Sequence, residues 1–216
     1  MVLLDLTYWC ENKFYVNPCI ECTNDCLFCV RNFQDGVYGF ELAGERNPSA
    51  HEIREAIEDT WDERFTDAAI VGFGEPLLNL DTSLEAIVTL EELSDVPMRM
   101  DTNGQASLIH PSRNVAVELK NAGLEEIQIS LNASSAKVYD LLCQSEFGLR
   151  AYDAVLQFAR SCKDVMRVVL SVVDIPGVDI EACRQVADEL QVDFRVRGFK
   201  GPSHIADSIS EKLSKT

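Results

Sequence analysis

Short apolar segments that suit β-strands alternate with helical patterns along most of this chain, and that order limits the folds available to it. Apolar runs predict strands over residues 68–71, 98–102, 127–132, 168–173 and 194–198. Apolar residues spaced three and four apart predict helices over residues 49–61, 82–93, 115–122, 136–143, 152–162 and 180–190. Strands that alternate with helices form right-handed βαβ units, so a parallel sheet covered by helices is expected.

The number of repeats bears on how such a sheet closes. About six βα repeats fall short of the eight that complete a barrel. We therefore predict an α/β fold, a partial (β/α)6 barrel open on one side, with a short N-terminal hairpin from strands at 4–9 and 13–17. A doubly wound open sheet is the alternative, and in either fold functional residues lie at the carboxyl ends of the strands. Residues 1–216 are expected to form a single domain, with N-terminal strands in 1–17 and a polar C-terminal tail over 202–216.

Two of the predicted helices begin with the capping-box pattern. Ser49 is followed three residues later by Glu52, and Thr82 by Glu85. In this pattern the hydroxyl accepts the backbone N–H of the acidic residue, whose carboxylate accepts the backbone N–H of the first residue. Helix starts are therefore expected at both positions.

Polar residues recur at every second position of the later predicted strands. Residues two apart on a strand share a face, which groups Arg99 with Asp101 and Asn103, Gln128 with Ser130 and Asn132, Arg167 with Ser171, and Arg195 with Arg197. If the apolar faces pack against helices, these polar faces converge inside the sheet and predict a cavity for a polar ligand, because buried polar groups need partners. The alternative is that they pair with one another, for example Asp101 with an arginine.

Composition restricts the partners of the chain. The formal net charge is −17 over 216 residues, which argues against nonspecific binding to nucleic acid or to an anionic membrane. The N-terminus lacks a signal-peptide pattern, and no stretch is long and apolar enough to cross a bilayer. We expect a cytoplasmic protein, in which eight cysteines point to metal binding rather than to disulfides.

Three of these cysteines, Cys22, Cys26 and Cys29, are spaced as CxxxCxxC. Three thiolates can hold three irons of a [4Fe–4S] cluster and leave the fourth iron without a protein ligand. A closed zinc site that also uses Cys19 is an alternative, and scattered core cysteines are another. Cys143, Cys162 and Cys183 fall on apolar helix faces and are expected in the core. Cys10 and Cys19 are expected to be structural, and a substrate-facing thiol near the cluster is the alternative for either.

The cysteine spacing, with Phe28 directly before Cys29, resembles the signature of radical S-adenosylmethionine (SAM) enzymes. The resemblance implies that SAM binds the open iron and that reductive cleavage releases a 5′-deoxyadenosyl radical. Gly74-Glu75-Pro76 resembles the family's GGEP motif, which binds the methionyl ammonium, although Phe73 replaces its first glycine. The protein would bind, orient and shield these cofactors, which carry the difficult chemistry.

The same resemblance implies a set of cofactor contacts. Phe28 occupies the position next to the adenine ring, and Glu75 and Gly74 belong to the ammonium-binding turn. Residues at later strand ends resemble the ribose and carboxylate contacts of the family, namely Asn103, Ser130, Asn132, Ser171 and Arg197. Guanidinium groups bind carboxylates in a bidentate way, so Arg197 suits a carboxylate of the cofactor or of a substrate.

The resemblance is greatest to compact radical SAM proteins associated with TatD-type hydrolases, through the string Cys-Thr-Asn-Asp-Cys-Leu-Phe-Cys-Val-Arg-Asn. It implies hydrogen abstraction from a small substrate, a low-potential flavodoxin or ferredoxin as electron donor, and a functional link to such a hydrolase. Arg99, Arg167 and Arg195 predict that the substrate is anionic. The alternatives are an activase that installs a glycyl radical on a partner protein, an iron–sulfur electron carrier or sensor, and a zinc-stabilised interaction domain. No residue is identified as a catalytic acid or base.

Overall fold

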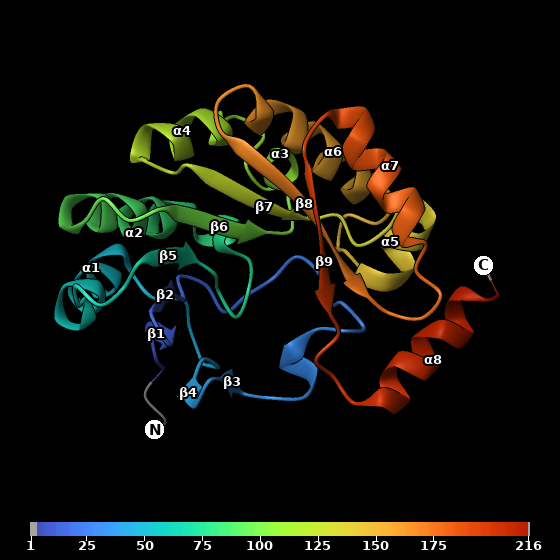
Figure 1. Cartoon of the computed structure of the whole chain (residues 1–216), viewed down its shortest axis with the longest axis horizontal. Helices are drawn as coiled ribbons and strands as arrows, with labels where there is room; N and C mark the ends of the chain where they lie inside the picture. Colours follow the sequence, from blue (N-terminus) through green and yellow to red (C-terminus); the bar gives the residue numbers. More distant parts are fainter. Residues whose placement is uncertain (1–3, 216) are drawn as a thin grey trace.

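The computed structural model describes residues 4–215, and its centre is a curved seven-stranded sheet (Figure 1). The strands are ordered β1-β2-β5-β6-β7-β8-β9. They span Thr7–Cys10 (β1), Lys13–Val16 (β2), Asp67–Ile70 (β5), Met98–Thr102 (β6), Glu126–Ser130 (β7), Arg167–Asp174 (β8) and Asp193–Gly198 (β9). β1 and β2 form the predicted antiparallel hairpin, and every later pair of neighbours is parallel.

The strand order distinguishes between the two predicted architectures. A doubly wound sheet reverses its order at a switch point, whereas here each strand lies beside the one that precedes it in this sheet. The chain therefore winds in one direction around a concave face. This α/β fold with a mostly parallel sheet is consistent with a partial barrel.

Most of the helices cover the convex side of the sheet, and the last one lies beyond the end of β9 (Figure 1). They span Ala50–Thr60 (α1), Leu80–Leu93 (α2), Ala106–Ile109 (α3), Val115–Ala122 (α4), Ala136–Cys143 (α5), Arg150–Lys163 (α6), Ile180–Leu190 (α7) and Ser203–Leu213 (α8). The remaining elements are two 3-10 turns and a two-stranded ribbon. The turns are η1 (Val30–Asn32) and η2 (Pro76–Asn79), and the ribbon is formed by β3 (Gly36–Val37) and β4 (Phe40–Glu41). The concave side holds the loop between β2 and η1.

One of the two predicted capping boxes is confirmed. The Ser49 hydroxyl accepts from the Glu52 nitrogen at 3.3 Å, and the Glu52 carboxylate accepts from the Ser49 nitrogen at 2.9 Å. The prediction at Thr82 is wrong, because α2 begins two residues earlier, at Leu80. η2, which starts at Pro76, runs directly into α2, so Thr82 lies inside the helix and donates instead to the Pro48 carbonyl at 3.4 Å.

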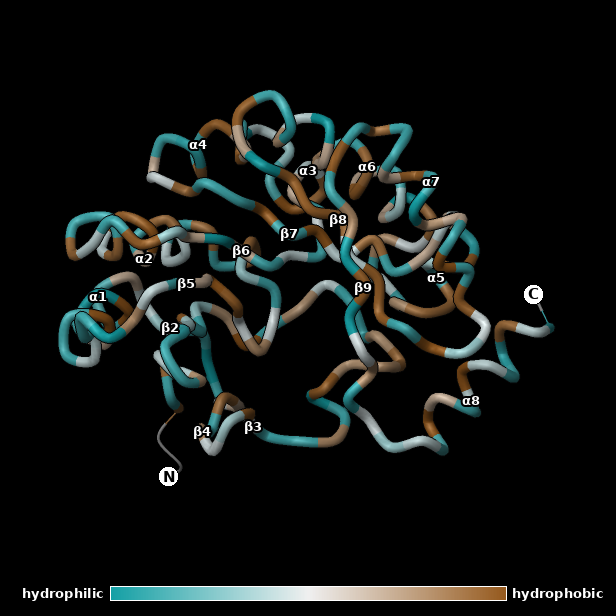
Figure 2. The backbone as a smooth tube through the Cα atoms, in the orientation of Figure 1, coloured by the Kyte–Doolittle hydropathy of each residue, from teal (hydrophilic) through white to brown (hydrophobic). Residues whose placement is uncertain are grey.

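The core lies between the sheet and its helices, as the alternation of apolar and polar strand residues predicts. Ile127 and Ile129 of β7 are completely buried on the helix side, and β8 stands out as hydrophobic in Figure 2. Cys162 and Cys183 are also fully buried, which confirms their expected place in the core.

The polar C-terminal stretch forms a helix. Residues 202–215 contain an eleven-residue helix, α8, in which Ala206 and Ile209 are buried. These two residues and Leu213 recur at helical spacing, so a narrow apolar stripe is enough to hold α8 beyond the end of β9 (Figure 1).

Candidate functional site at the carboxyl ends of the strands

The loop that carries the three cysteines docks against the end of α5. The Leu27 nitrogen donates to the Leu142 carbonyl at 3.0 Å, and the Asp25 nitrogen donates to the Cys143 carbonyl at 3.0 Å. The Glu146 nitrogen donates back to the Thr23 carbonyl at 2.9 Å. These backbone bonds fix the loop on the concave side of the sheet, so the cysteines have a defined position without secondary structure of their own.

All three cysteine thiols are partly buried and electrostatically coupled. Burial is the main cause that raises the pKa of Cys22 to about 12, and Glu75, Cys26 and Cys29 contribute to the rise through their charges. A hydrogen bond with Cys143 is the main cause that raises the pKa of Cys26, and burial raises that of Cys29. Three thiolates gathered in this environment are costly unless a metal centre balances their charge, because metal ligands must be deprotonated. The donor set therefore suits an iron–sulfur cluster.

The zinc alternative does not fit the same residues. Cys19 is fully buried, and its thiol donates to the Glu21 carbonyl at 3.4 Å and to Asn47 Oδ1 at 3.3 Å. Within residues 4–215, no three His, Cys, Asp or Glu side chains converge on a position for one ion. A zinc site needs its sulfurs about 2.3 Å from a shared ion, whereas each cysteine of a cluster binds a different iron.

The loop after β5 packs closely against the start of the cysteine loop. The Gly74 nitrogen donates to the Cys19 carbonyl at 2.8 Å, and the Glu75 nitrogen donates to the Glu21 carbonyl at 2.7 Å. A Cβ atom on Gly74 would lie 2.0 Å from the Glu21 carbonyl oxygen, so only glycine allows this approach. Phe73, which departs from the expected motif, donates through its backbone nitrogen to Asn17 Oδ1 at 2.8 Å.

The Glu75 carboxylate turns into the protein and joins two loops. It is 2% exposed and accepts from Thr102 Oγ1 at 2.6 Å, from the Asn103 nitrogen at 2.6 Å and from the Leu77 nitrogen at 3.0 Å. Burial raises the pKa of Glu75 to about 7, although these three donors oppose the shift. In the structure, its carboxylate therefore positions the loops after β5 and β6.

A buried polar network that sequence reasoning missed ties the cysteine loop to β6 and α5. Asn103 Nδ2 donates to Thr23 Oγ1 at 2.8 Å, and Thr23 Oγ1 donates to Gln105 Oε1 at 2.9 Å. Gln105 Nε2 donates to Asn24 Oδ1 at 2.7 Å and to the Tyr139 hydroxyl at 3.0 Å. The only sequence signal was polar residues after a predicted strand, which does not reveal contacts made across 80 residues.

Two buried polar atoms at the carboxyl ends of β7 and β9 have no hydrogen-bond partner among the described residues, Asn132 Oδ1 and Arg197 Nε. Arg197 Nη2 donates to Ser130 Oγ at 3.2 Å, and Asn132 Nδ2 donates to Cys143 Sγ at 3.8 Å. Burial lowers the pKa of Arg197, and the charge of Asp101 is the largest effect that opposes this shift. Buried polar groups normally have partners, so these atoms beside the cysteine loop fit a polar ligand.

Further down the concave face, the predicted polar residues meet both as ion pairs and around a hollow. Arg99 pairs with Asp67 at 3.3 Å and with Asp101 at 3.2 Å. Gln128 Nε2 donates to Asp101 Oδ2 at 3.1 Å, and Gln128 Oε1 accepts from Arg195 at 3.1 Å. A hollow of about 460 Å³ opens beside Arg99 and Arg195, and it lies toward the amino ends of the strands, because Asp67, Glu126 and Arg167, which begin β5, β7 and β8, also line it.

Comparisons with known proteins identify the family of this chain. Residues 16–190 match the sequence profile of the radical SAM superfamily. This chain belongs to the radical SAM superfamily. An uncharacterised protein of Methanocaldococcus jannaschii is 26% identical over 81% of this chain and 53% of its own length. A probable dual-specificity RNA methyltransferase RlmN of Synechococcus is 28% identical over 71% of this chain and 42% of its own length.

The fold itself recurs in solved structures. Streptococcus suis SuiB bound to S-adenosylmethionine matches with a TM-score of 0.65 at 17% identity, over 95% of this chain and 45% of SuiB. The chain spans about half the length of the curated relatives it matches. Radical SAM enzymes use a [4Fe–4S] cluster and SAM, so the chain is an enzyme with these two cofactors. Among residues 4–215, no helix combines the length and the apolar character needed to span a membrane.

The surroundings of three further predicted contact residues differ from one another, and their roles stay predictions. Arg167 begins β8 at its amino end, is 64% exposed and pairs with Glu126 and Asp193, so the structure does not bring it to the cysteine loop. The Ser171 side chain is fully buried and donates to the Ile129 carbonyl at 3.5 Å. Phe28 is partly buried and packs against the hydrophobic core.

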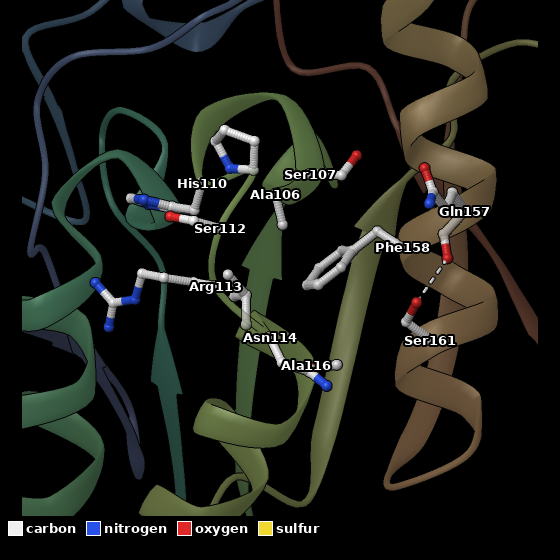
Figure 3. A pocket seen from close by; sticks show the side chains of 12 residues that line it. Ala106, Ser107, His110, Ser112, Arg113, Asn114, Ala116, Gln157, Phe158 and Ser161 are labelled. Carbon is white, nitrogen blue, oxygen red and sulfur yellow. Dashed lines mark hydrogen bonds between the residues drawn. The ribbon is translucent and has the colours of Figure 1, made fainter.

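A second hollow, of about 450 Å³, lies between α3, α4 and α6 (Figure 3). Ser107, His110 and Phe158 are among the residues that line it, and none of the predicted cofactor contacts does. Arg113 points along its edge but is neutralised by Glu118 and Asp81. None of the residues that line this hollow belongs to the cysteine loop.

Proposed function

We propose that Cys22, Cys26 and Cys29 hold the [4Fe–4S] cluster and leave one iron for SAM. The observation that carries this proposal is the position of the cysteine loop, which lies beside two buried atoms without partners, Asn132 Oδ1 and Arg197 Nε. When loaded, such a site supplies an electron for reductive cleavage of SAM, and the resulting 5′-deoxyadenosyl radical abstracts hydrogen from the substrate. The substrate is a small, anionic molecule.

The residues around the cysteine loop have separate roles in this proposal. Arg197 offers an unpartnered Nε donor that suits the methionyl carboxylate. Asn132, whose backbone is in the left-handed region at a φ of 54°, offers an acceptor for a hydroxyl or ammonium group. Gly74 keeps the turn after β5 close to the cysteine loop, while the Glu75 carboxylate fixes that turn by accepting a hydrogen bond from the Asn103 nitrogen. Asn103 and Ser130 orient Thr23 and Arg197 through their hydrogen bonds.

Electron paramagnetic resonance of protein prepared without oxygen tests the proposed function. After reduction with dithionite, the spectrum should show a [4Fe–4S]⁺ signal that changes when SAM is added, and 5′-deoxyadenosine should accumulate slowly. A cluster signal that ignores SAM would indicate an electron carrier or sensor instead. Protein that holds zinc but takes up no iron would rule out the radical mechanism.

The finer assignments rest on the sequence and on the strand count. Six strands, β2 and β5 to β9, run parallel and support a partial (β/α)6 barrel. The string from Cys22 to Asn32 supports the compact TatD-associated subgroup, with a functional link to a TatD-type hydrolase. We propose that the chain works in the cytoplasm and takes its electrons from a low-potential flavodoxin or ferredoxin.

A further inference from the structure

The cysteine loop runs beside the end of α5 in an antiparallel pairing that fixes the neighbour of Cys26. Asn24 and Ser145 form an isolated antiparallel bridge, and the backbone hydrogen bonds on either side of it keep the same register. In such a pairing each step forward along one segment is a step back along the other. Cys26, two residues after Asn24, therefore lies opposite Cys143, two residues before Ser145.

This register brings the thiols of Cys26 and Cys143 together. Residues that face each other across an antiparallel pair have Cβ atoms roughly 4.5 to 5.5 Å apart, with both side chains on one face. Cys143 is fully buried, and Cys26 packs against the hydrophobic core to which Cys143 belongs. The two side chains form a hydrogen bond with each other. Cys143 therefore touches one of the three loop cysteines from inside the core.

The amide of Asn132 determines the direction in which the Cys143 thiol can donate. Asn132 is 4% exposed, and its Nδ2 donates to Cys143 Sγ at 3.8 Å. The Cys143 sulfur is thus the acceptor on the side of Asn132. A thiol offers one weak donor and one weak acceptor, so the S–H of Cys143 is left to donate toward Cys26 Sγ. The three side chains form a short chain of donors that ends at the loop cysteine.

We propose that the Cys143 thiol donates a hydrogen bond to the Cys26 thiolate of the loaded protein and is a positioning residue that makes the cluster easier to reduce. This inference rests on the proposed function, in which Cys26 holds one iron. Hydrogen bonds to the sulfurs of an iron–sulfur cluster help to set its reduction potential. A donor to the thiolate favours the reduced form, because that form carries the additional negative charge.

A redox titration followed by electron paramagnetic resonance, on protein reconstituted without oxygen and kept free of SAM, tests the assignment. At the solution potential that leaves half of the native cluster reduced, the ratio of reduced to oxidised cluster should be at least about threefold lower in Cys143→Ala, which lacks the donor. Cys143→Ser keeps an O–H donor and should restore the native ratio. Cys162→Ala, which removes another fully buried helix cysteine, is the matched control and should titrate like the native protein.

Exchange of hydrogen for deuterium provides a second measurement that a residue of purely structural role would not change. The native protein and the three variants are reconstituted in D2O, and electron nuclear double resonance records the exchangeable deuterons coupled to the reduced cluster. The native protein, Cys143→Ser and Cys162→Ala should share a coupling that Cys143→Ala lacks. If Cys143→Ala takes up no iron, this coupling in Cys143→Ser decides, because a serine that replaced a cluster ligand would carry no proton there.

The outcomes that overturn the inference are distinct from those that support it. A native ratio in Cys143→Ala would overturn it. An equal fall in Cys143→Ala and Cys143→Ser, or an equal fall in Cys162→Ala, would assign the effect to packing rather than to a donor. Absence of the exchangeable coupling from Cys143→Ser would also overturn it.

The proposed function is scored separately, because SAM is added only after the titration. A cluster whose potential depends on Cys143 but whose signal ignores SAM would contradict the proposed function alone. A signal that responds to SAM in a protein whose potential is independent of Cys143 would contradict only the role of Cys143. Protein that takes up no iron at all would overturn both.

Discussion

The carboxylate of Glu75 accepts a hydrogen bond of 2.6 Å from the backbone nitrogen of Asn103, and this contact joins the loops that follow β5 and β6. The side chain of the same Asn103 donates to Thr23 in the cysteine loop at 2.8 Å. Three segments that are far apart in the sequence are thus connected through one buried carboxylate and one amide. The geometry of the candidate site depends on contacts between loops rather than on the sheet alone.

Replacement of Glu75 by glutamine should change how stability depends on pH. The pKa of Glu75 is raised to about 7 in the folded protein, whereas an unfolded glutamate titrates near about 4.3. Folding therefore takes up a proton between these values. The contribution of Glu75 to stability is fully present below about 4.3 and is lost as the pH rises through about 7. Glu75→Gln cannot titrate and should not show this loss.

Urea unfolding of protein handled without oxygen, repeated between about pH 5 and pH 8, measures the effect. The free energy of unfolding of the native protein should fall relative to that of Glu75→Gln as the pH rises. Glu63→Gln, at an exposed position, is the control and should follow the native protein. Parallel curves for the native protein and Glu75→Gln would contradict the raised pKa.

A methyl group at Gly74 should displace the cysteine loop. The Cβ of alanine would lie 2.0 Å from the Glu21 carbonyl oxygen, which is backbone and cannot rotate away. We expect Gly74→Ala to cost about 1 to 3 kcal/mol of folding free energy, as overpacking usually does, and to lower the iron bound per chain. Gly198→Ala is the matched control, because no atom lies within 4 Å of its added Cβ. Equal stability and iron content in the two variants would refute this role of Gly74.

The sheet was predictable from the sequence because its signals are local. Apolar runs, the capping box at Ser49 and the glycine at residue 123, whose φ is 115°, each act over a few residues. The wrong prediction of a helix start at Thr82 shows the limit of such signals. The residues match a capping box, but η2 begins at Pro76 and leads directly into α2, so the helix has started before Thr82.

The site was only partly predictable, because its decisive contacts are long-range. The spacing of Cys22, Cys26 and Cys29 identified the loop, but no periodicity links Thr23 to Gln105, which lies 82 residues away. Register on a strand correctly grouped Arg195 with Arg197 on one face. It did not show that Arg167, at the other end of its strand, would be neutralised by Glu126.

Removal of the Tyr139 hydroxyl should loosen the network behind the cysteine loop. This hydroxyl accepts from Asn24 Nδ2 at 3.1 Å and from Gln105 Nε2 at 3.0 Å, and the side chain is fully buried. Tyr139→Phe leaves both donors without that acceptor, which should cost about 1 to 3 kcal/mol. Urea unfolding measures the loss, and the variant should also release iron faster.

Tyr152→Phe is the control for this change. Tyr152 is 7% exposed, and no hydrogen bond of its hydroxyl is found within residues 4–215. Its loss should therefore cost much less than that of the Tyr139 hydroxyl. A Tyr139→Phe protein as stable as Tyr152→Phe would show that the network does not hold the loop.

Alanine at each of the three loop cysteines should abolish cluster binding, whereas alanine at Cys19 should not. Cys22, Cys26 and Cys29 share one loop, while the Cys19 thiol is fully buried and bonded to Glu21 and Asn47. Iron and acid-labile sulfide, measured after reconstitution without oxygen, should fall at least tenfold in the three loop variants. Cys19→Ala should keep its iron, although the lost side-chain contacts should lower its stability.

Cys162→Ala is the matched control for these variants, because Cys162 is fully buried in α6 and should influence only stability. If Cys19→Ala lost its iron as completely as Cys22→Ala, the cluster would have four protein ligands. No iron would then be open to SAM, since a fully ligated cluster transfers electrons but offers no binding position. Retention of iron in Cys19→Ala would therefore indicate a cluster with an iron open to SAM, rather than a fully ligated cluster that only transfers electrons.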